Sequence, residues 1–432
     1  MNINDLYQLF LSHPVVTTDT RDCPPDSIFF ALRGASFDGN AFAAQALEAG
    51  CAYAVVDDPK VAGSTDRIIL VDNVLQTMQH LAHLHRNTLG TPIVQITGTN
   101  GKTTTKELTT AVLRERYRVL ATEGNFNNHI GVPKTLLRLT AEHEMAVVET
   151  GANHPGEIAQ LSAIVNADCG LITNVGKAHL EGFGSFEGVI RTKTELYDYL
   201  RERTDRFIFL DGDNEHLTPR SAGLQTFTYG RPGKGYAVEG EVVACDPFLR
   251  LRWRVAGGEW QEVQTQLIGA YNVTNALAAA AVGVRYGVTP AQISHAIANY
   301  TPTNSRSEMR VTLHNRLIID AYNANPTSMR AALDNFSLIP DAHKVAIIGE
   351  MRELGTASEA EHRAVVAQLQ AMALEEVWLV GQNFSAVAPE DFRSFADVAA
   401  VKAYLSAHPL DGKLILVKGS NGTRLFQLPE LL

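Results

Sequence analysis

The chain has 432 residues and a net charge of −10, and 45 % of its residues are hydrophobic while 19 % are charged. At roughly 150 residues per domain, this length predicts two to four domains with ordinary packed cores. The negative charge argues against a nucleic-acid-binding surface, because such a surface needs a basic stripe.

The N-terminal segment 1–14 contains an acidic residue and only a short apolar run, so it does not resemble a signal peptide. No apolar run in the sequence approaches the ~18 residues of a membrane span. The four cysteines form no C-x-x-C motif and are expected to be reduced and buried. We therefore expect a cytoplasmic monomer that has no membrane span and binds no nucleic acid.

Short strand-like runs mark the start of the chain, at 27–32, 52–57 and 67–72. Between the first two lies a helical pattern, 40–50, which Gly50 closes as the residue after the helix. We expect a small mixed α/β domain over residues 1–85.

The pattern changes near residue 91, where "PIVQIT" reads as a strand buried on both faces of a parallel sheet. A glycine turn and a helix from about Lys102 to Glu115 follow. Further strand candidates alternate with helical segments, which is typical of a doubly wound, mostly parallel sheet. Residues 236–266 alternate like antiparallel strands and predict an appended sheet. We expect this central, P-loop-type ATPase domain to span 86–300.

A turn-rich segment, "NYTPTNSRSE", marks the next expected boundary. Beyond it, four apolar runs alternate with helical segments: 316–322, 344–351, 376–381 and 413–420. They predict a C-terminal Rossmann-like α/β domain over 301–432, and so an α/β protein of three domains.

The stretch "TGTNGKTTTK" ends as a P-loop does, with Gly101-Lys102-Thr103, but Ile96 stands where the usual first glycine would be. It joins a buried strand to a helix, so the backbone N–H groups of residues 99–102 are expected to face an anion at the helix N-terminus. Lys102 would add a charge, and Thr103 is placed to hold Mg²⁺. The alternative is a Gly-Lys helix start without a ligand.

Polar residues follow two later strand candidates, with Glu149 at one strand end and His179 in the loop after the other. Ligands of open α/β sheets bind outside the carboxyl ends of the strands, so both residues are expected to converge on the glycine turn. A carboxylate there can bind Mg²⁺, and a neutral imidazole can also be a ligand. A helix-capping or ion-paired Glu149 and a surface His179 are the alternatives.

Six motifs occur in an order that resembles the Mur ligases, the ATP-dependent amide-forming enzymes of peptidoglycan synthesis. They are "TGTNGKTTT", "ETGANHPGEI", "NVGKAHLEGFGSFEGVIRTKTEL", "GAYNVTNALAA", "DAYNANPTSM" and "GEMRELG". In this family the phosphate loop is a short form that starts at Gly98. "YNANP" and "GEMRELG" resemble the branch that joins D-alanyl-D-alanine to UDP-N-acetylmuramoyl-tripeptide through an acyl phosphate. A sibling ligase and a non-catalytic nucleotide-binding sensor are the alternatives.

The resemblance implies roles for residues at the nucleotide and metal sites. ATP is expected at Gly98, Thr99, Asn100, Gly101, Lys102, Thr103, Thr104, Asn272, Asn275, Arg306 and Asp320. Two Mg²⁺ sites are expected at Thr103, Glu149, His179 and Lys193, with Lys193 carbamylated. Lys102, His179 and Lys193 would be the catalytic residues. Without the resemblance, Lys193 reads equally well as a solvated helix lysine.

The resemblance also implies substrate-binding residues in all three domains. They are Thr20, Arg21, Arg33 and Gly34 for the uridine nucleotide, Asn127 and Asn128 for the muramoyl peptide, and Tyr322, Asn323 and Asn325 in the C-terminal domain. Two positions depart from the family pattern, since Asn40 replaces a usual histidine and Thr20 a usual serine.

Overall fold

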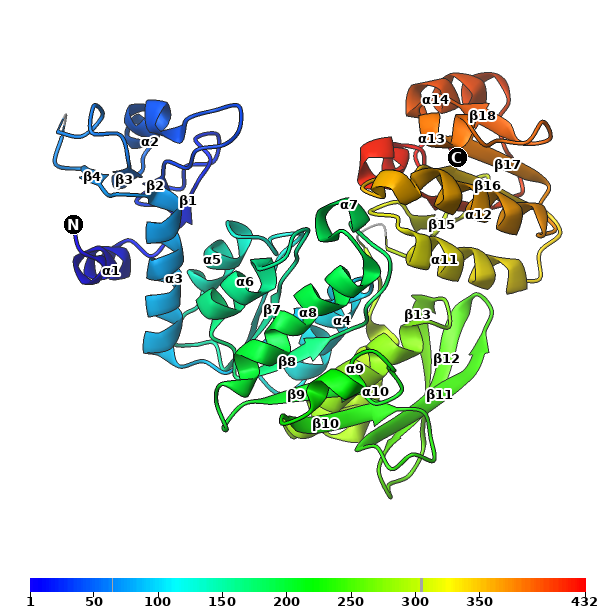
Figure 1. The fold of residues 1–432 in the computed structure, drawn as a ribbon, viewed down its shortest axis with the longest axis horizontal. Helices are drawn as coiled ribbons and strands as arrows, with labels where there is room; N and C mark the ends of the chain where they lie inside the picture. Colours follow the sequence, from blue (N-terminus) through cyan, green and yellow to red (C-terminus); the bar gives the residue numbers. More distant parts are fainter. Residues whose placement is uncertain (64, 304–305) are drawn as a thin grey trace.

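The structure is a computed structural model and describes residues 1–63, 65–303 and 306–432. Three β-sheets follow one another along the chain, each with its own helices (Figure 1). The predicted class, an α/β protein with three domains, is confirmed. No helix in the described ranges is long and apolar enough to cross a membrane.

The N-terminal sheet consists of four short parallel strands in the order β1-β2-β3-β4. The strands are β1 (Val16–Thr17), β2 (Ile28–Phe30), β3 (Tyr53–Val56) and β4 (Ile68–Leu70). Helices α1 (Ile3–Ser12) and α2 (Ala43–Glu48) accompany them. Gly50 adopts φ 117° after α2, the conformation expected of a residue that ends a helix.

Helix α3 (Val74–Leu89) connects the N-terminal sheet to the central one. Its buried side chains share one apolar core with strands of both sheets. The helix runs on to Gly90, where φ is 65°, so the division expected at residue 85 would cut a helix. The buried positions Val74, Met78, Leu81 and Ala82 have helical spacing, and Asn73 caps the helix at its start, so the helix is consistent with its sequence.

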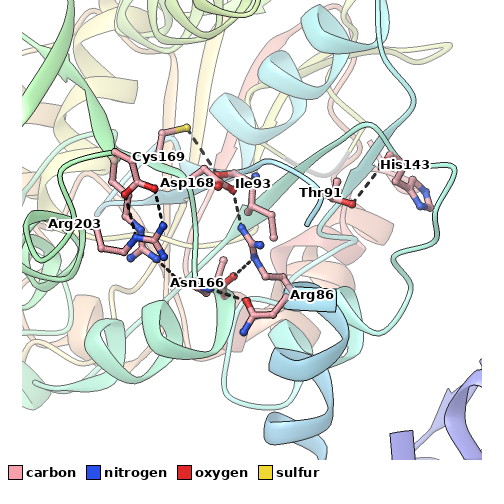
Figure 2. A network of polar contacts seen from close by, with 12 residues as sticks. Arg86, Thr91, Ile93, His143, Asn166, Asp168, Cys169 and Arg203 are labelled. Atoms are coloured by element: carbon pink, nitrogen blue, oxygen red, sulfur yellow. Dashed lines mark hydrogen bonds and ion pairs between the residues drawn. The ribbon is translucent and has the colours of Figure 1, made fainter. Parts of the chain in front are cut away.

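Arg86, in the last turn of α3, fastens this helix to the central sheet (Figure 2). Its Nε donates to the carbonyl of Val165 at 3.0 Å, and its Nη2 lies 2.7 Å from Asp168 Oδ2. The same carboxylate accepts the backbone N–H of Ile93 at 2.8 Å. The end of α3 and the start of the central strand are thus held by one ion pair between the buried Arg86 and the half-exposed Asp168.

The central sheet has nine strands in the order β13-β12-β11-β10-β9-β8-β5-β7-β6. Its parallel part is β5 (Ile93–Thr97), β6 (Val119–Ala121), β7 (Met145–Glu149), β8 (Cys169–Ile172), β9 (Phe207–Asp211) and β10 (Gln225–Gly230). One face packs on α4 (Lys102–Arg114), α9 (Asn272–Arg285) and α10 (Pro290–Asn299). The other packs on α5 (Gly131–Leu136), α6 (Glu157–Val165) and α8 (Phe186–Arg201).

The strands expected between 236 and 266 are antiparallel, but they continue the central sheet. They are β11 (Val238–Cys245), β12 (Phe248–Val255) and β13 (Gln261–Ile268). β11 pairs in parallel with β10, and this pairing joins the two parts. Leu249, Leu251 and Trp253 on one side of β12 are buried in the same core as α9 and α10.

The C-terminal sheet has the order β14-β15-β19-β16-β17-β18 and is parallel except for its edge strand β14. The strands are β14 (Glu308–Val311), β15 (Arg316–Asp320), β16 (Lys344–Gly349), β17 (Glu376–Val380), β18 (Arg393–Phe395) and β19 (Leu414–Lys418). Its helices are α11 (Pro326–Leu338), α12 (Ser358–Gln370), α13 (Gln382–Ser385) and α14 (Val398–Ala407). The described chain leaves α10 at Asn299 and enters β14 at Glu308.

Candidate active site

A cavity of about 740 Å³ lies at the carboxyl ends of the central strands and is lined by both the central and the C-terminal domain. Sixteen of the predicted site residues line it: Thr99, Asn100, Gly101, Lys102, Thr104, Asn127, Asn128, Glu149, His179, Asn272, Asn275, Arg306, Asp320, Tyr322, Asn323 and Asn325. Ligands of open α/β sheets bind at this end of the strands.

Two glycines of the loop between β5 and α4 are required by their surroundings. Gly98 has φ 141°, and a Cβ there would lie 2.1 Å from Thr173 Oγ1. Gly101 has φ 76°, and a Cβ there would lie 2.6 Å from Asn275 Oδ1. Ile96 is fully buried inside β5, so the loop begins two residues after it. The loop is therefore a compact turn that ends at the N-terminus of α4.

Asn174, at the end of β8, holds this loop from the side. Its carbonyl accepts the N–H of Thr99 at 2.9 Å, and its Oδ1 accepts the N–H of Asn100 at 3.0 Å. The expectation that the N–H groups of residues 99–102 all face an anion is therefore wrong for these two. The N–H groups at the start of α4, from Lys102 onward, remain suited to an anion, since a helix leaves its first N–H groups unpaired.

Lys102 folds back over the loop, where its Nζ donates to the carbonyls of Gly98 at 3.0 Å and Thr99 at 2.9 Å. Burial lowers the pKa of Lys102 to about 8; the Glu149 charge opposes this shift and the Arg306 charge adds to it. The ammonium remains the main form at neutral pH. It supplies a buried positive charge beside the loop.

Glu149 is fully buried at the end of β7 and faces the loop. Its Oε2 accepts the hydroxyl hydrogen of Thr103 at 2.8 Å, and its Oε1 accepts Nδ2 of Asn127 at 2.8 Å. Within the described ranges Glu149 caps no helix and forms no ion pair. It is a buried carboxylate that lines the cavity and accepts from two neighbouring side chains.

Lys193, on α8, is only 2 % exposed and is therefore no solvated helix lysine. Its Nζ donates to the carbonyl of Ala152 at 3.3 Å and lies 5.4 Å from the centre of the Phe183 ring. Burial lowers the pKa of Lys193 to about 7, and the nearby charge of Lys102 contributes. These surroundings favour a neutral amine, which is the form able to react with CO₂.

His179 precedes the short helix α7 (Leu180–Phe183) and adopts φ 49°. It lines the cavity, and its Nδ1 pairs with the carboxylate of Glu353 from the C-terminal domain. Burial lowers the pKa of His179, while the Glu353 charge opposes that shift. His179 is thus fixed between two domains, unlike a loosely held surface histidine.

The C-terminal domain brings two cations to the cavity. Lys418 is buried, and its Nζ lies 2.5 Å from Asp320 Oδ2. The guanidinium of Arg306 stacks over Tyr322 at 4.0 Å from the ring centre. Among the residues that the structure describes, the buried Nε of Arg306 has no hydrogen-bond partner. An unpaired, buried guanidinium nitrogen in a cavity wall is a ready donor to an anionic ligand.

Asn272 and Asn275 lie at the N-terminus of α9 and support the loop. Asn272 Nδ2 donates to the carbonyl of Ile268 at 2.8 Å, and Asn275 Nδ2 donates to Asn272 Oδ1 at 2.8 Å. Asn275 Oδ1 accepts the hydroxyl hydrogen of Thr105 at 3.1 Å. Both side-chain amides form hydrogen bonds to other protein atoms, although both residues also line the cavity.

Seven predicted site residues do not line the cavity. Gly98 precedes the lining residue Thr99, Thr103 bonds the lining Glu149, and Lys193 bonds the lining Ala152. The other four, Thr20, Arg21, Arg33 and Gly34, lie in the N-terminal domain. Arg21 pairs with Asp19 at 2.7 Å, and Arg33 pairs with Asp57 at 2.9 Å. A ligand that touches both regions must be long.

Asn40, which departs from the family pattern, is a buried structural residue. Its Nδ2 donates to Asp38 and Asp57, and its Oδ1 accepts the backbone N–H groups of Asp57 and Asp58. Both the Nδ2 and the Oδ1 of Asn40 are hydrogen-bonded, so the side chain links two loops of the N-terminal domain.

The site also contains residues that motif reasoning missed. Lys418 is one of them, and it lies at the end of β19. Others are Asn153, Glu157, Asp211, Ser307, Thr327 and Ser328. Most of them lie inside the quoted motifs, Asn153 and Glu157 in "ETGANHPGEI" and Thr327 and Ser328 in "DAYNANPTSM", so the motifs indicated the segments but not these side chains.

The fold and the site together define a phosphate-loop nucleotide-binding α/β protein. Family models match the chain at residues 14–86 ("Mur ligase family, catalytic domain"), 96–283 ("Mur ligase middle domain") and 305–421 ("Mur ligase, glutamate ligase domain"). The chain belongs to the Mur ligase family.

Curated relatives extend this similarity over nearly the whole chain. The UDP-N-acetylmuramoyl-tripeptide--D-alanyl-D-alanine ligase of Bacillus subtilis is 35 % identical over 98 % of this chain and 94 % of its own. The Escherichia coli protein of the same name is 34 % identical over 96 % of this chain and 93 % of its own. A crystal structure of MurF from Acinetobacter baumannii superposes with a TM-score of 0.87 at 29 % identity, covering 98 % of this chain and 96 % of that one.

Proposed function

We propose that the protein is an ATP-dependent ligase that joins D-alanyl-D-alanine to UDP-N-acetylmuramoyl-tripeptide in the cytoplasm, acting as a monomer. Full-length similarity to relatives named for this reaction supports the substrates. The observation that carries the chemistry is the meeting of Lys102, Glu149 and His179 in one cavity that the C-terminal domain closes.

We assign the three parts of the reaction to three domains. Residues 1–85 would bind the uridine nucleotide, 86–300 the ATP, and 301–432 the dipeptide. The separation between the Arg21 and Arg33 region and the cavity fits an extended nucleotide-sugar-peptide that reaches from one to the other. Asn127 and Asn128, which line the cavity, would contact its peptide end.

The residues present fit a nucleotide triphosphate. The start of α4 and the Lys102 ammonium offer a cradle for anionic oxygens, and the unpaired Arg306 Nε offers a further donor from the C-terminal domain. Thr104, Asn272 and Asn275 line the same wall. Asp320 would orient Lys418 on the opposite side.

The residues also fit Mg²⁺. Glu149 and Thr103 supply hard oxygen donors that already lie 2.8 Å apart. In the described part of the chain, no three His, Cys, Asp or Glu side chains cluster as a complete metal site. Phosphate oxygens would have to complete the shell, as is usual for Mg²⁺. When bound, the ion supplies neutralisation of the charge that develops on the transferred phosphoryl group.

A carbamate on Lys193 would supply the carboxylate for a second metal site beside His179. The neutral amine attacks CO₂, a C–N bond forms, and one proton is released. Burial favours the neutral amine of Lys193, and an unmodified ammonium beside a metal ion would be repelled by it.

The chain's own residues then perform electrostatic and positioning work. The peptide carboxylate attacks the γ-phosphorus and forms an acyl phosphate while ADP leaves. Lys102 and Arg306 stabilise the oxygens that gain charge. The amine of D-alanyl-D-alanine attacks the acyl carbon, the C–N bond forms, the C–O bond to phosphate breaks, and the nitrogen releases a proton.

The test is the release of inorganic phosphate with each substrate omitted in turn. The proposal expects release only when ATP, the UDP-muramoyl-tripeptide and D-alanyl-D-alanine are all present. Turnover with a single amino acid in place of the dipeptide would indicate a sibling ligase. Nucleotide binding without turnover would indicate a sensor.

A further inference from the structure

Two non-glycine residues with left-handed backbones meet across the boundary between the central and C-terminal domains. His179 has φ 49° and Glu353 has φ 60°, and the carboxylate of Glu353 pairs with Nδ1 of His179. Non-glycine residues seldom adopt this conformation, and they persist there only where the surroundings hold them. Their direct contact indicates that the two strained positions serve one feature.

The loop that carries Glu353 is held firmly in the C-terminal domain. Ser420 Oγ donates to the carbonyl of Glu350 at 2.6 Å. The N–H of Met351 donates to Nε2 of the buried His362 at 3.0 Å. This loop is the "GEMRELG" motif, to which the reaction assigns no role so far. Glu353 is its tip, and its position follows from that of the C-terminal domain.

The same tip is also fixed to the segment that follows His179. The N–H of Glu181 donates to the carbonyl of Glu353 at 3.2 Å. Glu353 therefore uses both its backbone and its side chain against residues 179–181. A second interdomain ion pair, Lys177 with Glu361 at 2.7 Å, lies close by in sequence but does not line the cavity.

The contact determines which ring nitrogen of His179 serves the cavity. Nδ1 is occupied by Glu353, and Nε2 has no hydrogen-bond partner among the described residues. An ionised carboxylate can only accept a hydrogen bond, so the pairing with Glu353 requires a hydrogen on Nδ1. A neutral ring that donates from Nδ1–H to a carboxylate keeps its lone pair on Nε2. His179 lines the cavity, so this lone pair is the group it can offer there.

We propose that Glu353 is a positioning residue that selects the Nδ1–H tautomer of His179 and orients its Nε2 toward the reacting groups. Because Glu353 belongs to the C-terminal domain, His179 is correctly set only when that domain is docked. This inference rests on the proposed ligase function. Carboxylates that orient ligating or catalytic histidines act in this way, and their loss typically lowers activity by about 10- to 100-fold.

The test compares Glu353→Ala, Glu353→Gly and Glu353→Gln with Glu361→Gln, the matched control that breaks the neighbouring interdomain ion pair. We expect kcat for phosphate release to fall about 10- to 100-fold in the Ala and Gly variants, with a nearly unchanged KM for ATP. The kcat of Glu353→Gln should fall less, since the amide oxygen can still accept from Nδ1–H of His179. Glu361→Gln should keep wild-type kcat.

A readout independent of turnover is the ¹⁵N NMR spectrum of the histidine-labelled full-length protein, with the His179 signals assigned by His179→Gln. The wild type should show a protonated Nδ1, and Glu353→Ala should shift the proton toward Nε2. Glu353→Gly should be more stable than Glu353→Ala, because glycine adopts φ 60° without strain. The two variants should nevertheless have the same reduced kcat, which a merely structural role of Glu353 would not give. Wild-type kcat in Glu353→Ala, or an unchanged tautomer, would overturn the proposal. An inactive wild type would instead refute the ligase function, and the tautomer would still decide the role of Glu353.

Discussion

Asn325 donates from its Nδ2 to Oδ1 of Asn100 at 2.7 Å, although the two residues are 225 positions apart. Asn100 belongs to the phosphate loop, and Asn325 is the residue that caps the N-terminus of α11. The nucleotide site is thus built from two domains. The N-terminus of α11, which begins at the last residue of the motif "YNANP", is placed directly against the loop.

The contact between these two amides is expected to support nucleotide binding. Asn325→Asp keeps an oxygen that can accept from the N–H of Ser328, now at 2.9 Å, so the helix cap survives. It removes the donor to Asn100 and places a negative charge beside the loop. We expect a roughly tenfold higher KM for ATP, with an unfolding temperature close to wild type.

The control for this change is Asp397→Ala, which removes the side-chain cap of α14, a helix of the same domain whose capping residue does not line the cavity. It should lower stability by about 1 kcal/mol and leave the KM for ATP unchanged. Thermal denaturation and steady-state kinetics measure both variants. Equal ATP affinity in Asn325→Asp and wild type would contradict the role of the amide pair.

Lys102 is expected to act on catalysis and not on folding. Lys102→Met removes the ammonium above the phosphate loop, and phosphate release should fall by at least about 100-fold. The circular dichroism spectrum should be unchanged. Lys106→Met is the matched control on the same helix, because Lys106 is a buried lysine that donates to the carbonyl of Thr122 at 2.7 Å and does not line the cavity. Lys106→Met should lower the stability of the protein and leave turnover unchanged. Lost turnover in Lys106→Met together with normal turnover in Lys102→Met would contradict these roles.

Lys193→Ala should abolish activity, and short carboxylates such as formate or acetate should restore part of it. The reason is that the proposed carbamate supplies a carboxylate, which a small anion can replace in the space that the truncation leaves. Phosphate release with increasing formate measures the rescue. Chloride at the same ionic strength is the control. Unchanged activity in the variant would refute the carbamate role.

Asp211 should make stability depend on pH. Burial raises the pKa of Asp211 to about 6, and the charge of Asp213 adds to this. The folded state therefore holds a proton that the unfolded state loses near pH 3.8, so a penalty grows as pH rises from about 4 to 6 and is complete above pH 6. Asp211→Asn should gain about 2 kcal/mol of unfolding free energy at pH 8, allowing for partial exposure, and clearly less at pH 5.

Asp213→Asn is the opposite control for this pH dependence. Asp213 pairs with Lys234 at 2.9 Å, and hydrogen bonds to the side chain of Lys234 and the backbone of Arg231 lower its pKa despite partial burial. Its contribution to stability is present at neutral pH and lost in acid. Urea denaturation at pH 5 and pH 8 measures the free energy of unfolding, which should be lower than in the wild type at pH 8 in this variant. The same sign of change in both variants at pH 8 would contradict the account.

Much of the fold follows from local sequence. Continuous apolar runs such as "PIVQIT" become buried parallel strands, and the alternation in β12 becomes an antiparallel strand with one buried side. The bounds of α3 agree with its cap at Asn73 and with Gly90, but no local pattern shows that its buried face contacts two sheets. The continuity of the central sheet depends on the pairing of β10 with β11, which no local period encodes.

Some residues of the site also follow from local sequence, whereas the contacts between domains do not. The glycine turn and Glu149 were found because their chemistry lies within a few residues of a strand end. The Asn100–Asn325 and His179–Glu353 contacts join residues 225 and 174 positions apart, and only the docking of two domains creates them. The buried state of Lys193 likewise depends on how α8 packs.

The most direct test of the ligase function is the mass of the product. The protein is incubated with ATP, Mg²⁺, UDP-N-acetylmuramoyl-tripeptide and D-alanyl-D-alanine, and the uridine-containing product is analysed by mass spectrometry. The account predicts a new species heavier than the tripeptide precursor by one D-alanyl-D-alanine minus one water, formed together with ADP and phosphate. Recovery of only the unchanged precursor, from protein that is folded and binds ATP, would contradict it.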